Sequence, residues 1–267
     1  ILIEAIGAGT NLTANADIFS TTGHVTILVG HDITFTATAD VTTGGTGTID
    51  IVSATGSIDQ HDNSRIITAD GDTRLHAYID IFLGGITTDA NASLIAFTGS
   101  IFDSGDAFHG EDIIANGVRL DAAIGIGLPT DHIETKITTV TARATSGGIY
   151  LHETDGFIVD DVEVTISEVQ ANNTLIARTD AKQSDIRTTT GNGSIVIWTS
   201  TGAIILNDGT ATADNTAIVA HGSGNIRIEG EATTTTFTAN ADILSTTGHI
   251  TILVGHDITF TSTADVT

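Results

Sequence analysis

Residues 13–42 read TANADIFSTTGHVTILVGHDITFTATADVT, and residues 238–267 read TANADILSTTGHITILVGHDITFTSTADVT. Each position of the first stretch recurs at a number higher by 225, and the two stretches are identical at 27 of 30 positions. The three differences keep the size class of the side chain: Phe19 to Leu244, Val25 to Ile250 and Ala37 to Ser262. Repetition at a fixed period indicates a tandem array of structural modules. We therefore predict that residues 13–42 and 238–267 are equivalent copies of a tandem repeat with period 225.

Within each copy, apolar and polar residues alternate. In HVTILVG (24–30), Val25, Ile27 and Val29 fall on one face of a strand. The same period of two recurs along the chain, for example in TIDIVSA (48–54), DTRLHAYIDIFLG (72–84), VEVTISEV (162–169), TLIART (174–179) and SIVIWTS (194–200). Aromatic residues make up only 4% of the chain, and β-branched residues favour strands over helices. The sequence therefore predicts an all-β protein in which helices are absent or trivial.

The strands recur at a regular spacing. Most gaps between the clearest apolar pairs are about 19–26 residues, which is too long for a meander of hairpins. This spacing suits a coil of three short strands and three bends, and stacked coils form a β-solenoid. We predict one continuous solenoid over residues 1–267, with about 20–26 residues per coil and roughly ten coils per repeat. Residues 102–111 and 127–132 are expected to be loops that leave the coil.

The bends are predicted from glycine. The chain has 29 glycines and a single proline, Pro129. Pairs such as Thr55-Gly56, Thr98-Gly99 and Thr201-Gly202 precede strands by a residue or two. We expect these glycines to supply the positive φ that a corner requires.

Residues 112–156 resemble a known family. The run IIANGVRLDAAIGIG, followed by IETKITTVTARATSGGIYLHETDG, is similar to the repeats of giant bacterial haemagglutinin-like adhesins of the filamentous-haemagglutinin type. The matching pieces are Val118–Leu120, Gly125–Gly127, Ile133–Thr135, Gly147–Leu151 and Glu153–Asp155. The resemblance implies a right-handed parallel β-helix, export to the bacterial cell surface, and a role in attachment or as a structural stalk. Histidine at positions 24, 31 and 152 departs from the family pattern.

Net charge limits the partners. The chain has 33 acidic and 9 basic residues, for a net charge of −24. Such a charge repels nucleic acid and anionic membranes, and no apolar run approaches the length of a membrane span. We expect neither nucleic-acid binding nor membrane insertion. The absence of cysteine excludes disulfides, and because the chain contains no methionine we expect it to be a piece of a longer protein.

The sequence offers little catalytic or metal-binding chemistry. Parallel β-helices include polysaccharide lyases, but only Lys136, Lys182 and seven arginines are present to serve as a base or to bind a sugar carboxylate. We predict no enzyme activity and no catalytic, cofactor-binding or metal-binding residues. Calcium is the one candidate cofactor, since carboxylates and amides cluster at residues 59–63 and 70–72. We interpret these residues as turn formers.

Histidine and tryptophan are further site candidates. His24 and His31, like their copies His249 and His256, are expected to be solvated turn residues. Trp198 falls on the face opposite to Ile195 and Ile197, where it either caps a coil or forms an exposed patch.

We predict a structural or adhesive segment of a very long extracellular surface protein or filament, acting as a stalk or attachment fibre. Its partners would be neighbouring repeats, end-to-end copies, other cell surfaces or glycans. The alternative is a carbohydrate-binding or polysaccharide-lyase-like β-helix. A stalk predicts a featureless outward mix of Thr, Asp and Asn, whereas a lyase predicts one groove with converged Asp, Arg or Lys. Three or more such groups in one groove would overturn the interpretation as a stalk.

Overall fold

The computed structural model describes residues 1–106 and 110–267. Within these ranges every regular element is a β-strand, and there is no helix of the length and apolarity that a membrane span requires. The chain forms two compact units, residues 1–116 with 163–181 and residues 117–162 with 182–267. The single continuous solenoid over residues 1–267 stays a prediction.

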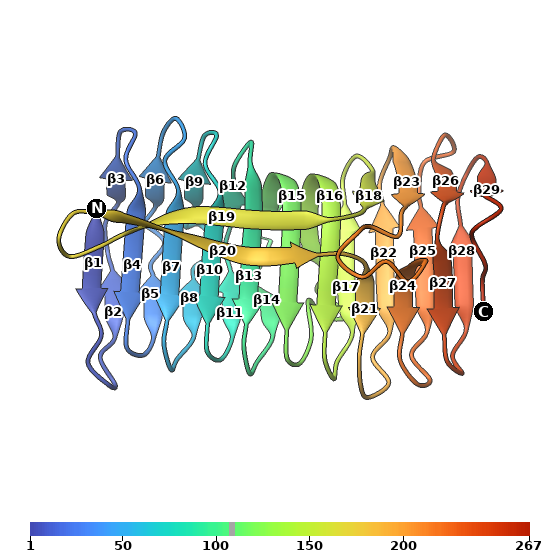
Figure 1. Ribbon diagram of the computed structural model, residues 1–267, viewed down its shortest axis with the longest axis horizontal. Coiled ribbons are helices and arrows are strands. Elements are labelled where there is room, and N and C mark those ends of the chain that lie inside the picture. Colours follow the sequence, from blue (N-terminus) through green and yellow to red (C-terminus); the bar gives the residue numbers. More distant parts are fainter. Residues whose placement is uncertain (107–109) are drawn as a thin grey trace. The chain divides into compact units, whose positions relative to one another are not determined.

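The first unit is built from three stacks of short parallel strands (Figure 1). The β4 stack contains β1 (Leu2–Ala5), β4 (Val25–Val29), β7 (Ile49–Ser53), β10 (Thr73–Ala77) and β13 (Asn91–Ala96). The second stack contains β2 (Leu12–Ala14), β5 (Ile33–Phe35), β8 (Ile58–Gln60), β11 (Ile81–Leu83) and β14 (Ile101–Asp103). The third contains β3 (Ile18–Ser20), β6 (Val41–Thr43), β9 (Ile66–Thr68), β12 (Ile86–Thr87) and the start of β15 (Ile113–Ala122). Each coil contributes one strand to each stack, which is the parallel β-solenoid that the sequence predicts.

The second unit repeats this arrangement. The β22 stack contains the start of β16 (Ile133–Ala144), β17 (Ile149–Glu153), β22 (Ile195–Thr199), β25 (Ile226–Gly230) and β28 (Ile250–Leu253). A second stack contains β18 (Phe157–Val159), β23 (Ala203–Leu206), β26 (Thr236–Ala239) and β29 (Ile258–Phe260). The β21 stack contains β21 (Ile186–Thr188), β24 (Thr216–Ala220) and β27 (Asp242–Ser245). The long strand β16 pairs in succession with β17, β18 and β21, and so takes part in all three stacks.

The coil length agrees with the sequence prediction. Val25 pairs with Ile49 and Ile49 with Thr73, and the ion-paired Asp50 and Arg74 are likewise separated by 24 residues, one coil. Apart from the inserted segment described next, a repeat with period 225 therefore holds about eight to nine coils, somewhat fewer than the predicted ten. The step from Ile149 to its partner Ile195 is nearly twice as long, because a segment that leaves the coil is inserted between them. The handedness of the solenoid stays a prediction.

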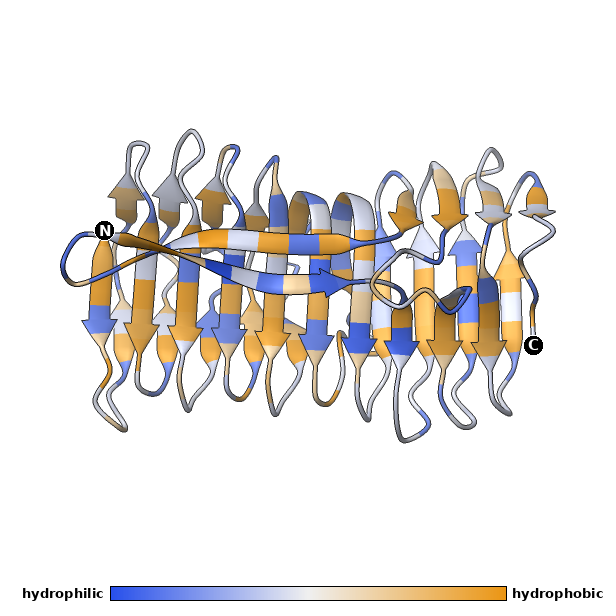
Figure 2. Ribbon diagram, viewed as in Figure 1, coloured by the Kyte–Doolittle hydropathy of each residue, from blue (hydrophilic) through white to orange (hydrophobic). Residues whose placement is uncertain are grey.

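The core is formed by the inward face of the alternating pattern. Val25, Ile27 and Val29 are buried as predicted, and the pattern of two continues through Ile33 and Phe35 of the next strand. Equivalent residues of successive coils stack in register, so the core is a set of continuous apolar columns. Figure 2 shows the hydrophobic colour concentrated in the strands and the hydrophilic colour at many of the bends. Burial of each such side chain contributes about 1.5–3 kcal/mol.

One prediction about the strands is wrong. Residues 162–169 and 174–179 are not coil strands but form a separate two-stranded sheet of β19 (Val162–Val169) and β20 (Leu175–Gln183). Residues 163–181 of this hairpin belong to the first unit and lie across β4, β7, β10 and β13 (Figure 1). Inward-facing Val164 and Ile166 are fully buried, whereas Leu175 and Ile176 are exposed. An alternating strand looks the same in sequence whether it packs inside a coil or on top of one.

The glycines act differently from the prediction. Of the three that followed threonine, only Gly202 has positive φ, at 82°. Gly56 and Gly99 are required because the bend of the preceding coil lies directly against them. A Cβ at Gly99 would lie 2.5 Å from the carbonyl oxygen of Ile79, and one at Gly56 would lie 2.7 Å from the carbonyl carbon of His31. Close stacking of bends, rather than backbone φ, therefore selects glycine at these two corners.

The two predicted loops are found in part. Residues 102 and 103 belong to β14, and the rest of that loop includes residues 107–109, which lie outside the described residues. Residues 127–132 do leave the coil: the Leu128 N–H donates to the Asp131 carbonyl at 2.6 Å, closing a tight turn around Pro129.

Candidate functional site

Among the residues that are candidates for calcium, Asp72 and Asn63 hold the backbone through hydrogen bonds. Asp72 Oδ1 accepts from the Asn91 N–H at 3.0 Å, and Asp72 Oδ2 accepts from the Thr165 N–H at 2.8 Å. Asn63 Nδ2 donates to the Ala37 carbonyl at 2.8 Å, while Asp70 is exposed. Asp72 therefore joins two coils and the hairpin, and these bonds reach distant segments of the chain rather than the neighbouring backbone of a turn.

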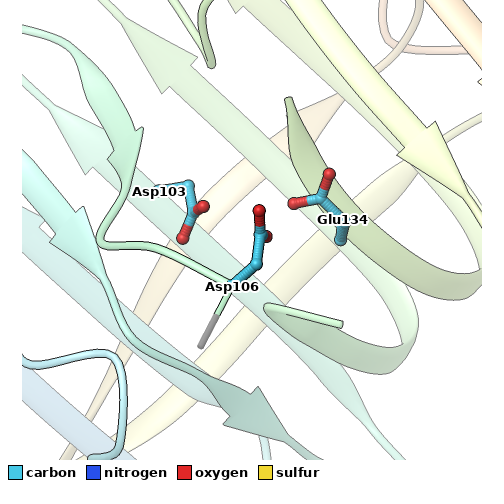
Figure 3. A group of neighbouring side chains, drawn as sticks. All are labelled: Asp103, Asp106 and Glu134. Atoms are coloured by element: carbon cyan, nitrogen blue, oxygen red, sulfur yellow. The ribbon is translucent and has the colours of Figure 1, made fainter. Parts of the chain in front are cut away.

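A second acidic group was not singled out in the sequence. Asp103, the last residue of β14, and Asp106, on the segment that follows, have carboxylate oxygens within 4.8 Å of each other (Figure 3). The Gly105 N–H donates to Asp103 Oδ1 at 2.8 Å. Figure 3 also draws Glu134, which belongs to the second unit. Exposed acidic neighbours are common without an ion, and we assign no metal site to them.

The histidines differ between the two copies. The Thr48 N–H donates to His24 Nδ1 at 3.0 Å, so half-buried His24 links one coil to the next. Burial, with a smaller effect from the N-terminal ammonium, lowers the pKa of His24. Its copy His249 is exposed, as is His256. The expectation of a solvated turn residue is therefore wrong for His24, and His31 is half-buried as well.

Trp198 belongs to an aromatic cluster on the outward face of the β22 stack. Its ring lies parallel to that of His132, with centroids 5.3 Å apart and an interplanar angle of 11°. The His152 ring meets it edge-on at 4.7 Å, and Tyr150 lies edge-on to His132 at 5.9 Å. Burial is the main cause that lowers the pKa of His132. Trp198 is thus neither an end cap nor a bare patch but a half-buried member of this cluster.

A groove of about 440 Å³ lies beside the cluster. Tyr150, Val196, Arg227 and Thr251 occur in register on four successive strands and line its length. Its polar rim includes Asn225 and His249. An aromatic ring next to a guanidinium and amide groups is an arrangement that suits a sugar, since each sugar ring has an apolar face and hydrogen-bonding edges.

A more enclosed pocket of about 240 Å³ lies against the β21 stack. Arg143, Lys182 and Arg187 line it together with Gln183, Ser184, Thr189, Ala211 and Thr212. Three of the nine basic residues of the chain therefore meet in one place. This convergence is the result that counts against a featureless stalk, so the stalk hypothesis is kept only for a segment that also carries binding sites. Lys136, the other lysine, is not among the lining residues and lies 3.9 Å from Asp155.

The sequence reasoning missed this pocket for an identifiable reason. Arg143 and Arg187 pair in register although much more than one coil of sequence separates them, because the hairpin is inserted between their strands. A search at the regular coil period does not bring them together. The available signal was the scarcity of basic residues, which makes any cluster of them informative.

A buried carboxyl occurs inside the second unit. Glu153 is on the inward face of β17, and its Oε2 accepts from Thr135 Oγ1 at 2.6 Å. The Ile137 N–H donates to Glu153 Oε1 at 3.2 Å. Burial raises the pKa of Glu153 to about 8, and these hydrogen bonds only partly oppose the shift. The alternation Ile149, Leu151, Glu153 marks this residue as inward in the sequence itself.

Comparison with known proteins gives no relative: no family model, no curated protein and no solved structure matches the chain. The function is therefore argued from the fold and these sites.

Proposed function

We propose that the chain is a structural and adhesive segment of a long extracellular repeat protein of the bacterial surface, serving as a stalk or attachment fibre. Coils that stack through continuous apolar columns can form a solenoid whose length increases with the number of coils. The net charge of −24 favours solubility of a long array. Strands of the two copies also fall at matching places, as with β4 and β28, or β5 and β29.

The observation that carries this proposal is that each coil covers the apolar residues of the coil before it. Ile33 and Phe35 on β5 are fully buried. In the first copy the next coil covers these residues, since Ile33 pairs with Ile58. A further repeat stacked on β29 would cover the second copy in the same way. The same face could accept another copy end to end, because unpaired strand edges invite pairing.

Tandem chains of increasing copy number test the stalk. Chains with one, two and three copies of the repeat would be compared by small-angle X-ray scattering. About eight to nine coils at about 4.8 Å each predict that the maximum dimension grows by roughly 40 Å per copy. Hydrogen exchange at Phe260 should slow once a further copy follows it. Compact particles whose length does not grow with copy number would contradict the proposal.

The groove on the β22 stack favours a second candidate function, carbohydrate binding. Attachment would occur where Tyr150, Arg227 and Asn225 meet, next to the Trp198 cluster. Because Trp198 is the single tryptophan, its fluorescence reports directly on this face. Titration with a panel of neutral and acidic polysaccharides should give a saturable change that Tyr150→Ala weakens and Tyr78→Ala does not. No change with any polysaccharide would refute binding here, and release of shorter oligosaccharides would indicate a lyase instead.

A further inference from the structure

The strongest feature without an assigned role is the pocket on the β21 stack. Arg143 stands on β16 and Arg187 on β21, and the two residues pair in register. Neighbouring strands lie about 4.8 Å apart, and like charges placed opposite each other destabilise a sheet. Lys182 adds a third positive charge at the rim. Such an arrangement requires negative charge close by.

The carboxylates of the chain meet only part of that requirement. Arg187 Nη2 lies 3.2 Å from Asp214 Oδ2 and 3.3 Å from Asp185 Oδ2, and Lys182 Nζ lies 3.2 Å from Asp161 Oδ2. Arg143 has no carboxylate partner among the described residues.

The contact that Arg143 does make is with a neutral amide. Its Nη2 donates to Gln183 Oε1 at 3.2 Å. Gln183 is buried and is held in place because its Nε2 donates to the Leu120 carbonyl at 3.0 Å. The fixed Gln183 side chain therefore holds the Arg143 guanidinium in its place in the pocket.

Hydrogen-bond donors remain unused in this place. The Nε atoms of Arg143 and Arg187 are buried and have no partner among the described residues. An unsatisfied buried donor costs about 1–3 kcal/mol, more when it is charged. Ser184, Thr189 and Thr212 add hydroxyl groups to the lining. Two guanidinium edges, an ammonium and hydroxyls around about 240 Å³ suit one small group with several acceptor oxygens.

We propose that this pocket binds an oxyanion, a sulfate or carboxylate group, between Arg143 and Arg187 with Lys182 at the rim. The surrounding Asp161, Asp185 and Asp214 limit the site to a single anionic group, because a second would meet repulsion. The hypothesis that an acidic glycan supplies this anion rests on the adhesive function proposed above. The binding chemistry itself does not depend on that function.

Inorganic sulfate is the probe that tests the site. Sulfate would be titrated into the whole chain at constant ionic strength, with sodium chloride as the balancing salt. The arginine Nε–H resonances would be followed by nitrogen–proton correlation spectra. We expect saturable shifts at Arg143 and Arg187 with a dissociation constant of roughly millimolar or tighter. Shifts that do not saturate, or that are equal with chloride alone, would overturn the proposal.

Variants connect the binding to the pocket. Arg143→Gln should weaken sulfate binding by about tenfold or more, the loss expected for a charge-assisted hydrogen bond. Lys182→Gln, at the exposed rim, should weaken it by a smaller factor and provides a variant that keeps the fold if Arg143→Gln does not. The matched control is Lys136→Gln, the other lysine of the same unit, which lies outside the pocket. Equal affinity in Lys182→Gln, Lys136→Gln and the unaltered chain would overturn the assignment.

The source of the anion is tested in separate titrations. Glucuronate, glucose 6-sulfate and neutral glucose would be compared with inorganic sulfate. Tighter binding of either acidic sugar than of inorganic sulfate supports a glycan source, and tighter binding of inorganic sulfate supports a free anion; neutral glucose should not bind. Failure of every anion overturns this pocket but leaves the groove intact, because the groove is reported by Trp198 fluorescence. Failure of the tandem chains to lengthen would leave anion binding untouched.

Discussion

The heptapeptides HVTILVG (24–30) and HITILVG (249–255) differ at one position, yet the structure uses their outward faces differently. Thr26 on β4 is fully buried, because its Oγ1 accepts from the Val169 N–H of the hairpin at 2.9 Å. Its copy Thr251 on β28 is exposed and lines the sugar-sized groove. The comparison shows that alternation determines which residues of a strand point outward. The elements packed on the strand determine whether those outward residues are exposed to solvent.

The two stacks differ in the same way beyond these strands. On the β4 stack, Arg74 lies between fully buried Asp50, at 2.9 Å, and Asp180 of the hairpin, at 3.0 Å. On the β22 stack, Arg227 is half exposed and pairs with Glu229. Arg74 is therefore enclosed between the sheet and the hairpin, whereas Arg227 is accessible to a ligand. Four pairs of variants test this contrast.

The largest difference is expected for matched isoleucines in the two copies. Ile27 is fully buried, and Ile27→Ala should lower the free energy of unfolding by about 4 kcal/mol through loss of burial and a residual cavity. Ile252, its half-buried copy on β28, should lose less than about 2 kcal/mol on the same change. Urea unfolding followed by circular dichroism measures both. Equal losses would show that the two coils are covered alike.

Removal of Arg74 is expected to be nearly as costly. Arg74→Ala should destabilise the chain by about 3 kcal/mol, because it leaves Asp50 buried without its partner. Arg227→Ala is the matched control and should change stability by less than about 0.5 kcal/mol, since its ion pair is solvated. Urea unfolding followed by circular dichroism measures the stability of both variants. A small effect of Arg74→Ala would mean that the hairpin does not seal the sheet.

Glu153 predicts a pH dependence confined to the second unit. Its register partners in the column are Thr135 on β16 and Thr199 on β22, whereas β17 has a carboxyl. Because burial raises the folded pKa to about 8 from 4.5, the folded state holds a proton that the unfolded state releases. Stability should therefore fall as the pH rises from about 4.5 to about 8.

A neutral replacement measures this contribution. Glu153→Gln removes the titration and should be more stable than the unaltered chain at pH 9, with little difference at pH 4. Urea midpoints at several pH values measure the effect. Glu231→Gln, at an exposed position of the same unit, should follow the unaltered chain at every pH. A parallel pH profile for Glu153→Gln and the unaltered chain would contradict the assignment.

The smallest effect compares the two threonines directly. Thr26→Ala removes the acceptor of the Val169 N–H and should cost about 1 kcal/mol, with faster hydrogen exchange at Val169. Thr251→Ala, at the matching place in the second copy, should change stability by less than about 0.5 kcal/mol. Unchanged exchange at Val169 in Thr26→Ala would show that the hairpin is held by other contacts alone.

Much of the fold could be predicted because its signals are local. Alternation in HVTILVG gives the strand and its inward side, and the spacing of apolar pairs gives the length of the coil. The hairpin could not be predicted, since residues 162–169 alternate like any coil strand. Its partners, such as Thr26, lie 143 residues away in the chain.

The sites depend on register, which the sequence reveals only where the coil is regular. Arg227 and Thr251 are one regular coil apart and could have been aligned from the coil period. Arg143 and Arg187 could not, because an inserted hairpin separates their strands. The coil period does not align Arg143 with Arg187, and the sequence therefore predicted no binding residues here. The titrations above test that prediction.

The sequence by itself determined an all-β chain, its duplication with period 225, its coil length and the inward column of each strand. These follow from side-chain alternation and backbone geometry, which act over a few residues or repeat from coil to coil. Only the tertiary structure decided that Thr26 is buried and Thr251 exposed, that Arg74 is sealed, and that Arg143 and Arg187 share a pocket. Those outcomes depend on which distant segment covers a face, and that choice is made by long-range packing.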